Sequence, residues 1–250
     1  MSQRRKYRKP PVVEALCELV FAHSRWDETV VGQFFDRVRQ DFPDRQAIDS
    51  LATNAGSPSD NRSTAVQNEP RMQFFSKERS RVVQVGRDIV VVNQLAPYPH
   101  FEAWKPTIAT AARDYAELAQ PRGVRRVALR YINVVQFADL RVELEQFFTV
   151  APRIPPAWDD EHGAFLVRIE KLVEPRLRLL MTFGSASPVL PNRSAALLDI
   201  YAIFEPESPI NPLNAEDLAS ALDRAHSSIE GAFESSITET LRVRFEPKIE

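Results

Sequence analysis

Apolar and polar residues alternate along several stretches of the chain, as they do in strands that cover a core with one face. The first such stretch is 12–23, and its wholly apolar face consists of Val13, Ala15, Cys17, Leu19 and Phe21. The opposite face places Glu14 and Glu18 between apolar residues. We therefore expect a strand with its apolar face on the core.

Similar alternation, or a run of β-branched residues such as Ile89–Val92, predicts eight further strands. A short edge strand is expected at 46–53, where the pattern is weakest. The others are expected at 71–77, 80–86, 88–95, 124–137, 164–173, 176–185 and 194–205.

Apolar residues spaced three and four apart predict helices between these strands. The first follows Asp27 as its N-cap and ends before Pro43, and the second covers 101–119. A short helix is expected near 139–148. The last begins at Asn214, and its apolar stripe continues to Phe245.

The predicted order is β-α-β-β-β-α, and it occurs twice, over 1–121 and 122–250. We interpret this as an α+β fold of two pseudo-duplicated halves in one integrated domain. A mostly antiparallel, curved sheet would carry the long helices on one face. The alternative is an ordinary α+β protein in which the order repeats by coincidence. The topology resembles the saddle fold of the TATA-binding protein, and a fold by itself does not carry function.

Composition and charge limit the partners and the cellular compartment that we expect for the protein. The net charge is −2, so no overall field attracts nucleic acid or anionic membrane. No apolar run reaches the roughly 18 residues of a membrane span, and no apolar stretch follows the basic N-terminus as in a signal peptide. The single Cys17 excludes an intramolecular disulfide. We expect a cytoplasmic protein with an inert, buried thiol.

The basic N-terminal run allows two interpretations. One is a solvated tail, and the other is a contact with phosphate or a partner. The run consists of Arg4, Arg5, Lys6, Arg8 and Lys9.

Known catalytic and cofactor motifs are missing from the sequence. There is no Gly-x-Ser-x-Gly elbow, and the dinucleotide and P-loop fingerprints are absent. None of the four histidines has a second His or a Cys at zinc-ligand spacing. Asp159–His162 is interpreted as a solvated acidic loop. We therefore predict no catalytic residue, no metal and no cofactor.

Six residues are candidates for a binding site. Glu14, Glu18, Arg126 and Arg130 fall on the open face if the first strand of each half is central. Glu14 or Glu18 could then pair with Arg130, either as a cross-strand ion pair of about 0.2–1 kcal/mol or within a ligand or partner site. His226 borders the last helical stripe. It is either a hydrogen-bonded boundary residue or a base acting with Glu14 or Asn133.

Three segments carry a family resemblance. They are Lys9–Ala15 (KPPVVEA), Arg130–Asn133 (RYIN) and His226–Thr238. In these segments the chain resembles a sporadically distributed, uncharacterised bacterial family of about this length. The resemblance implies a bacterial, horizontally transferred gene of the kind often linked to mobile elements or defence. It supplies no activity to carry over. Positions to test are Pro11, Glu14, Arg130, Asn133, His226 and Thr238.

Three functions remain open at this point. The first is a non-catalytic interaction component of a bacterial multi-protein system, bound to an as yet unknown protein partner. The second is a nucleic-acid-binding module that uses the open face and Arg122–Arg130. The third is an enzyme with a site between the halves. The oligomeric state is left undetermined, and the loops 54–68 and 149–163 are expected to be mobile or to order on binding.

Overall fold

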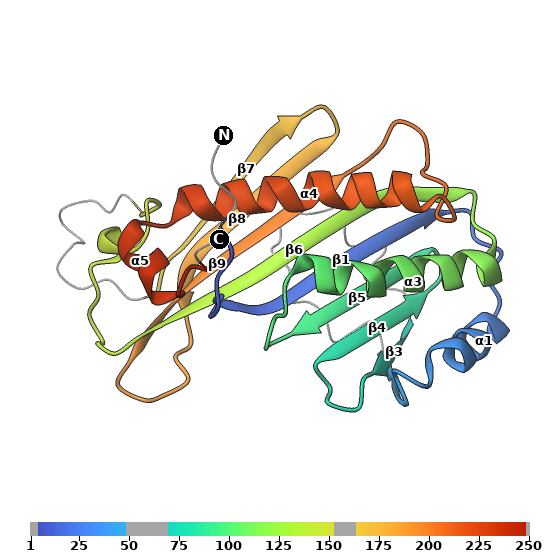
Figure 1. Cartoon of the computed structure of the whole chain (residues 1–250), viewed down its shortest axis with the longest axis horizontal. Helices are drawn as coiled ribbons and strands as arrows, with labels where there is room; N and C mark the ends of the chain where they lie inside the picture. The colour runs from blue at the N-terminus through green and yellow to red at the C-terminus, as the bar shows by residue number, and fades with distance from the viewer. Residues whose placement is uncertain (1–4, 49–69, 153–163, 249–250) are drawn as a thin grey trace.

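A computed structural model describes residues 5–48, 70–152 and 164–248. The predicted loop 54–68, the Asp159–His162 segment and most of the loop 149–163 lie outside the described residues. The described residues form one antiparallel sheet of nine strands in the order β2-β3-β4-β5-β1-β6-β9-β8-β7 (Figure 1). The α+β class and the antiparallel sheet predicted from the sequence are confirmed.

The strands follow the predicted ranges closely. They are β1 (Val12–Ala22), β2 (Asp44–Ile48), β3 (Arg71–Phe75), β4 (Arg81–Gly86), β5 (Ile89–Leu95), β6 (Gly123–Phe137), β7 (Leu166–Glu174), β8 (Leu177–Ala186) and β9 (Ser194–Phe204). The short edge strand begins two residues earlier than predicted, and 49–53 lie outside the described residues.

The two predicted halves meet at the centre of the sheet, where β1 pairs with β6 in a register that places Cys17 opposite Leu129. β1 pairs with β5 on its other side, and β6 pairs with β9. One continuous sheet therefore contains strands from both halves.

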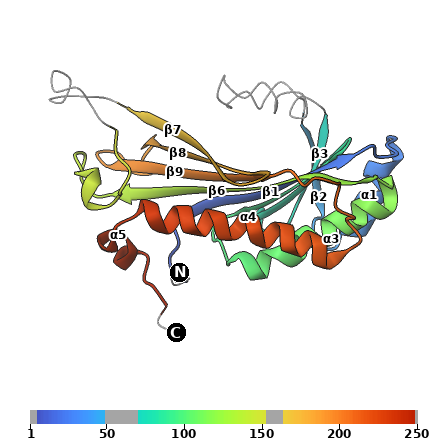
Figure 2. The same ribbon diagram turned by 90° about the horizontal axis from the view of Figure 1, so that it is seen from above.

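The helices are α1 (Thr29–Val38), α3 (Phe101–Ala119), α4 (Ala215–Ser236) and α5 (Glu239–Arg244), with a 3-10 turn at Leu144–Gln146. Figure 2 shows α3 and α4 on the same side of the sheet, while β3 and β7 curve away on the other side. The apolar face of β1 and the stripes of these helices form the main core, in which Leu19, Trp104 and Leu129 are almost wholly buried.

Three helix predictions need correction. The first helix ends at Val38, four residues before Phe42, although Phe42 is still buried. The helix expected near 139–148 is only a 3-10 turn. The last helix is interrupted at Ile237, whose backbone is extended, and α5 begins after the cap Thr238. The apolar stripe crosses this break because α5 packs on the same core.

The internal duplication stays a prediction. Both halves place their first strand at the sheet centre and a long helix on the same face. However, the ten-residue α1 of the first half corresponds only to the three-residue 3-10 turn in the second. No described helix is long and apolar enough to cross a membrane.

Candidate functional site

The six candidate residues lie on two opposite faces of the sheet. Glu14 and Glu18 alternate along β1 with residues of the main core, so they face away from α3 and α4. Arg126 and Arg130 are on that same open face of β6. Asn133 and His226 line a cavity on the helical side. The six residues predicted as one site therefore do not lie together, because the fold places them on opposite faces of the sheet.

The charged residues of the open face bind one another. Arg126 forms an ion pair with Glu18, and the two side chains are 11% and 9% exposed. Arg130 binds Asp199 of β9, with Nε 2.9 Å from Oδ1 and Nη2 2.5 Å from Oδ2. The hydrogen bonds of Arg130 therefore go to Asp199 and not to Glu14 or Glu18, the two predicted partners. Asp199 raises the pKa of Arg130, and the nearby charge of Glu14 raises it further.

The register of the sheet places two carboxylates near Arg130. Glu14 lies opposite Ile132, diagonally next to Arg130, and Asp199 occupies the equivalent diagonal on β9. The carboxylate of Glu14 instead accepts a hydrogen bond of 2.6 Å from Asn93 Nδ2. Two small apolar clusters, centred on Val20 and on Ala128, cover the remaining centre of this face. Arg126 and Arg130 therefore each already have a carboxylate partner.

The cavity is a hollow on the helical side of the sheet. It has a volume of about 740 Å³ and is enclosed by the N-terminal segment, the turn before α3, β6 and α4. Residues of both halves line it, including Tyr98 and Phe101 from the first half and Tyr131 and His226 from the second. The cavity therefore depends on the whole fold.

Aromatic side chains form the floor of the cavity. The hydroxyls of Tyr98 and Tyr131 share a hydrogen bond of 2.8 Å, and their rings meet edge to face with centroids 5.5 Å apart. Trp104 makes edge contacts with both rings. Burial raises the pKa of both phenols above the ordinary value, so both stay neutral at physiological pH.

His226 lies flat against Phe101, with ring centroids 3.9 Å apart and an angle of 7° between the planes. Its Nδ1 is 3.7 Å from Oε2 of Glu230, one turn later on α4. Glu14 is on the other face of the sheet, so the predicted pairing of His226 with Glu14 is wrong. The sequence reasoning missed Glu230, although its i,i+4 spacing from His226 on a predicted helix was a usable signal.

Asn133 lines the same cavity as His226, but its side chain forms hydrogen bonds with the backbone of the sheet. Its Nδ2 donates to the carbonyl of Leu198 at 2.9 Å and to that of Tyr131 at 3.3 Å. The side chain is 2% exposed. Its amide group therefore satisfies backbone acceptors rather than acting on His226.

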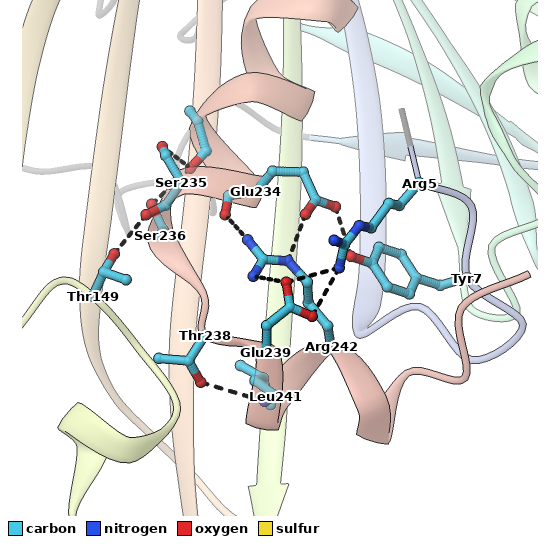
Figure 3. Close-up of polar contacts among 11 residues, drawn as sticks. Arg5, Tyr7, Thr149, Glu234, Ser235, Ser236, Thr238, Glu239, Leu241 and Arg242 are labelled. Carbon is cyan, nitrogen blue, oxygen red and sulfur yellow. Dashed lines mark hydrogen bonds and ion pairs between the residues drawn. The ribbon is translucent and has the colours of Figure 1, made fainter. Parts of the chain in front are cut away.

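Ion pairs and hydrogen bonds hold the N-terminal segment at the rim of the cavity (Figure 3). Arg5 Nη1 binds both carboxylate oxygens of Glu239, at 3.0 and 2.9 Å. Tyr7 Oη donates to Glu234 at 2.7 Å, and Arg242 bridges Glu234 and Glu239. Arg5 of the basic run is therefore bound to α5, and the interpretation as a solvated tail is wrong for this residue.

The described residues contain no group of three or more His, Cys, Asp or Glu that could hold a metal ion. No family model matches the chain, and no curated protein matches it. The bacterial family resemblance therefore stays a prediction.

Proposed function

We propose that this protein is a non-catalytic interaction protein whose cavity receives a segment of a protein partner. The observation that supports this is a preformed hollow of about 740 Å³ walled by aromatic and proline side chains. Pockets of this size, lined by aromatic groups with a few polar ones, are typical recognition sites. Buried aromatic side chains also dominate the binding energy of protein interfaces.

The polar groups of the cavity suit orientation of a bound segment. The paired phenols of Tyr98 and Tyr131 can each accept or donate a hydrogen bond without a charge change, because both stay neutral. Glu102 and Lys248 stand among the residues at the lining and offer charges of both signs. A partner segment with an apolar anchor and flanking polar groups would fit this arrangement.

The proposal also includes the cellular compartment and the kind of system to which the protein belongs. We place the protein in the cytoplasm as one component of a bacterial multi-protein system. Its one cysteine, Cys17, is a free and fully buried thiol. A chain without disulfides suits a reducing compartment.

One observation favours a second candidate, an enzyme with a site between the halves. The cavity is lined by both halves, and it contains the His226–Glu230 pair, in which a carboxylate can orient an imidazole as a base. Turnover of a substrate that disappears in His226→Gln would establish this candidate.

The nucleic-acid alternative receives less support. Arg126 and Arg130, two arginines of the open face, are each paired with a carboxylate. Phosphate contacts at these positions would first have to break the ion pairs. A salt-sensitive complex with single-stranded DNA or RNA would revive the alternative.

Affinity purification of the tagged chain from its host tests the proposal directly. A stoichiometric protein identified by mass spectrometry is the expected result. Absorbance at 260 nm that nuclease removes, with no protein partner, would contradict the proposal in favour of nucleic acid. Recovery of the chain alone, at concentrations that preserve weak complexes, would also contradict it.

A further inference from the structure

The two edges of the sheet differ sharply in chemistry. β2 has five residues, and it presents Asp44, Arg45 and Gln46, which are polar and exposed. β7 has nine residues, and among the described strands it pairs only with β8. Polar, short edges protect sheets from unwanted pairing, and β2 has that protection.

β7 exposes large apolar side chains along its edge. Leu166 is 66% exposed, Leu172 is 63% exposed, and Ile169 is 46% exposed. Figure 1 shows the strand at the margin of the sheet, beyond β8. A long apolar edge strand is a template for pairing with another strand.

The sequence of β7 is complementary to itself in antiparallel pairing. The strand is regular over Leu166–Leu172, and the first irregularity of its pairing with β8 follows Leu172. Ile169 is the centre of this regular stretch. A second copy centred on the same residue places Leu166 opposite Leu172 and Arg168 opposite Glu170. The two-fold symmetry makes each of these pairs occur twice. In each pair, the two side chains lie on the same face of the sheet.

Neighbouring registers are unfavourable. A two-fold axis perpendicular to the sheet keeps each face on its own side, so a symmetric pairing must place some residue opposite itself. Centring on Arg168, Glu170 or Lys171 would place two like charges directly opposite each other. The register centred on Ile169 avoids this and also matches the opposite charges.

Glu170 also has a basic partner within its own copy. Its Oε1 accepts a hydrogen bond of 3.1 Å from Arg178 Nη1 on the neighbouring strand β8. In the paired arrangement the carboxylate would lie between Arg178 and Arg168 of the second copy. The like-charged Arg168 and Arg178 would then be separated by an acid.

We propose that two copies of this chain associate edge to edge through β7, antiparallel and centred on Ile169. The sheet then continues from one copy into the other. The helices of both copies lie on the same side, because the two-fold axis preserves the faces. The inference rests on β7 alone and does not depend on the cavity or on its partner.

Sedimentation velocity over a wide range of protein concentration tests this arrangement with charge-reversal variants. The wild type is expected to form a concentration-dependent dimer. Arg168→Glu places two acids opposite each other, and Glu170→Arg places two bases opposite each other. Each single variant should raise the dimer dissociation constant by about tenfold or more, since like charges directly opposite destabilise strand pairing.

Two mixtures make the test specific to the register. The double variant R168E/E170R restores opposite charges and should recover the dimer. An equimolar mixture of R168E and E170R should form a heterodimer, because every cross-strand charge pair is then complementary. Both residues are exposed, so circular dichroism should show that each variant is folded.

Three results would overturn the inference. They are a wild type that stays monomeric at all concentrations, a dimer that both single variants leave unchanged, and single variants that fail to recover association when mixed. Because the readout is the mass of the purified chain, each of these results leaves the proposed cavity function standing.

Discussion

Glu18 and Arg126 form an ion pair on the face of the sheet that points away from the helices, and solvent reaches barely a tenth of either side chain. The two residues are diagonal neighbours across the central β1–β6 pair, with Glu18 opposite Ala128 and Arg126 opposite Val20. Removal of one charge from a buried pair leaves the other charge uncompensated, whereas removal of both charges can be nearly neutral.

Removal of one partner should therefore be costly. Glu18→Ala leaves a buried guanidinium without its carboxylate, and we expect the free energy of unfolding to fall by about 3–5 kcal/mol in urea denaturation. The double variant Glu18→Leu/Arg126→Met removes both charges and should be close to the wild type. As a control, Glu174→Gln breaks an exposed pair with Arg224 and should cost less than about 1 kcal/mol. A cost below about 1 kcal/mol for Glu18→Ala would show that solvent screens the central pair.

The paired phenols of the cavity floor should behave as a unit. Tyr98→Phe leaves the buried hydroxyl of Tyr131 without its partner, which should cost about 1–3 kcal/mol of unfolding free energy. The double variant Tyr98→Phe/Tyr131→Phe removes both hydroxyls, so its cost should be smaller than the sum of the single costs. Strict additivity in this double-mutant cycle would contradict a direct hydrogen bond.

The ion pair between Arg5 and Glu239 predicts a pH dependence. The hydrogen bond from Arg5 lowers the pKa of Glu239 below its usual value of 4.5. The pair therefore contributes stability above the unfolded-state pKa, and the contribution is lost as the pH falls through the lower folded-state pKa. The melting temperatures of the wild type and Arg5→Ala should differ near pH 6, and the difference should shrink as the pH falls below the unfolded-state pKa of Glu239. A difference that is independent of pH would contradict the ion pair.

The thiol of Cys17 should be unreactive toward thiol reagents in the folded protein. Its side chain is fully buried, and burial raises the pKa of the thiol well above its ordinary value. We expect no reaction with Ellman's reagent in native buffer and one equivalent of thiol in denaturant. A fast stoichiometric reaction of the native protein would show that β1 is accessible.

The local pattern of apolar and polar residues predicted the strands and helices well. A strand or helix with one buried face repeats its apolar residues at a spacing that is typical of that element. The strands β1 and β9 lie within one residue of their predicted ends. The break at Ile237 was missed for a physical reason. Leu241 and Phe245 after the break are buried in the same core as α4, so the apolar stripe continues while the backbone does not.

The sites were harder to predict, because they depend on which strands become neighbours. Asp199 binds Arg130 only because β9, more than sixty residues later in the chain, lies next to β6. Likewise, Tyr98 reaches Tyr131 only because the turn before α3 lies against β6. Alternation assigns a residue to a face, but it does not give the strand order.

Two glycines offer the most direct test of the proposed cavity function. Gly231 lines the cavity on α4, Gly32 lies on α1, and a Cβ added to either meets no atom within 4 Å. Gly231→Leu therefore adds a side chain at the cavity wall, and Gly32→Leu is a matched control remote from it. Both changes favour the helical backbone, because glycine is a poor helix former.

The measurement is the amount of partner that each tagged variant retains from the host lysate, relative to the wild type. The proposed function predicts that Gly32→Leu retains the wild-type amount, while Gly231→Leu retains about tenfold less. Equal retention by the two variants would contradict the cavity as the site of partner binding.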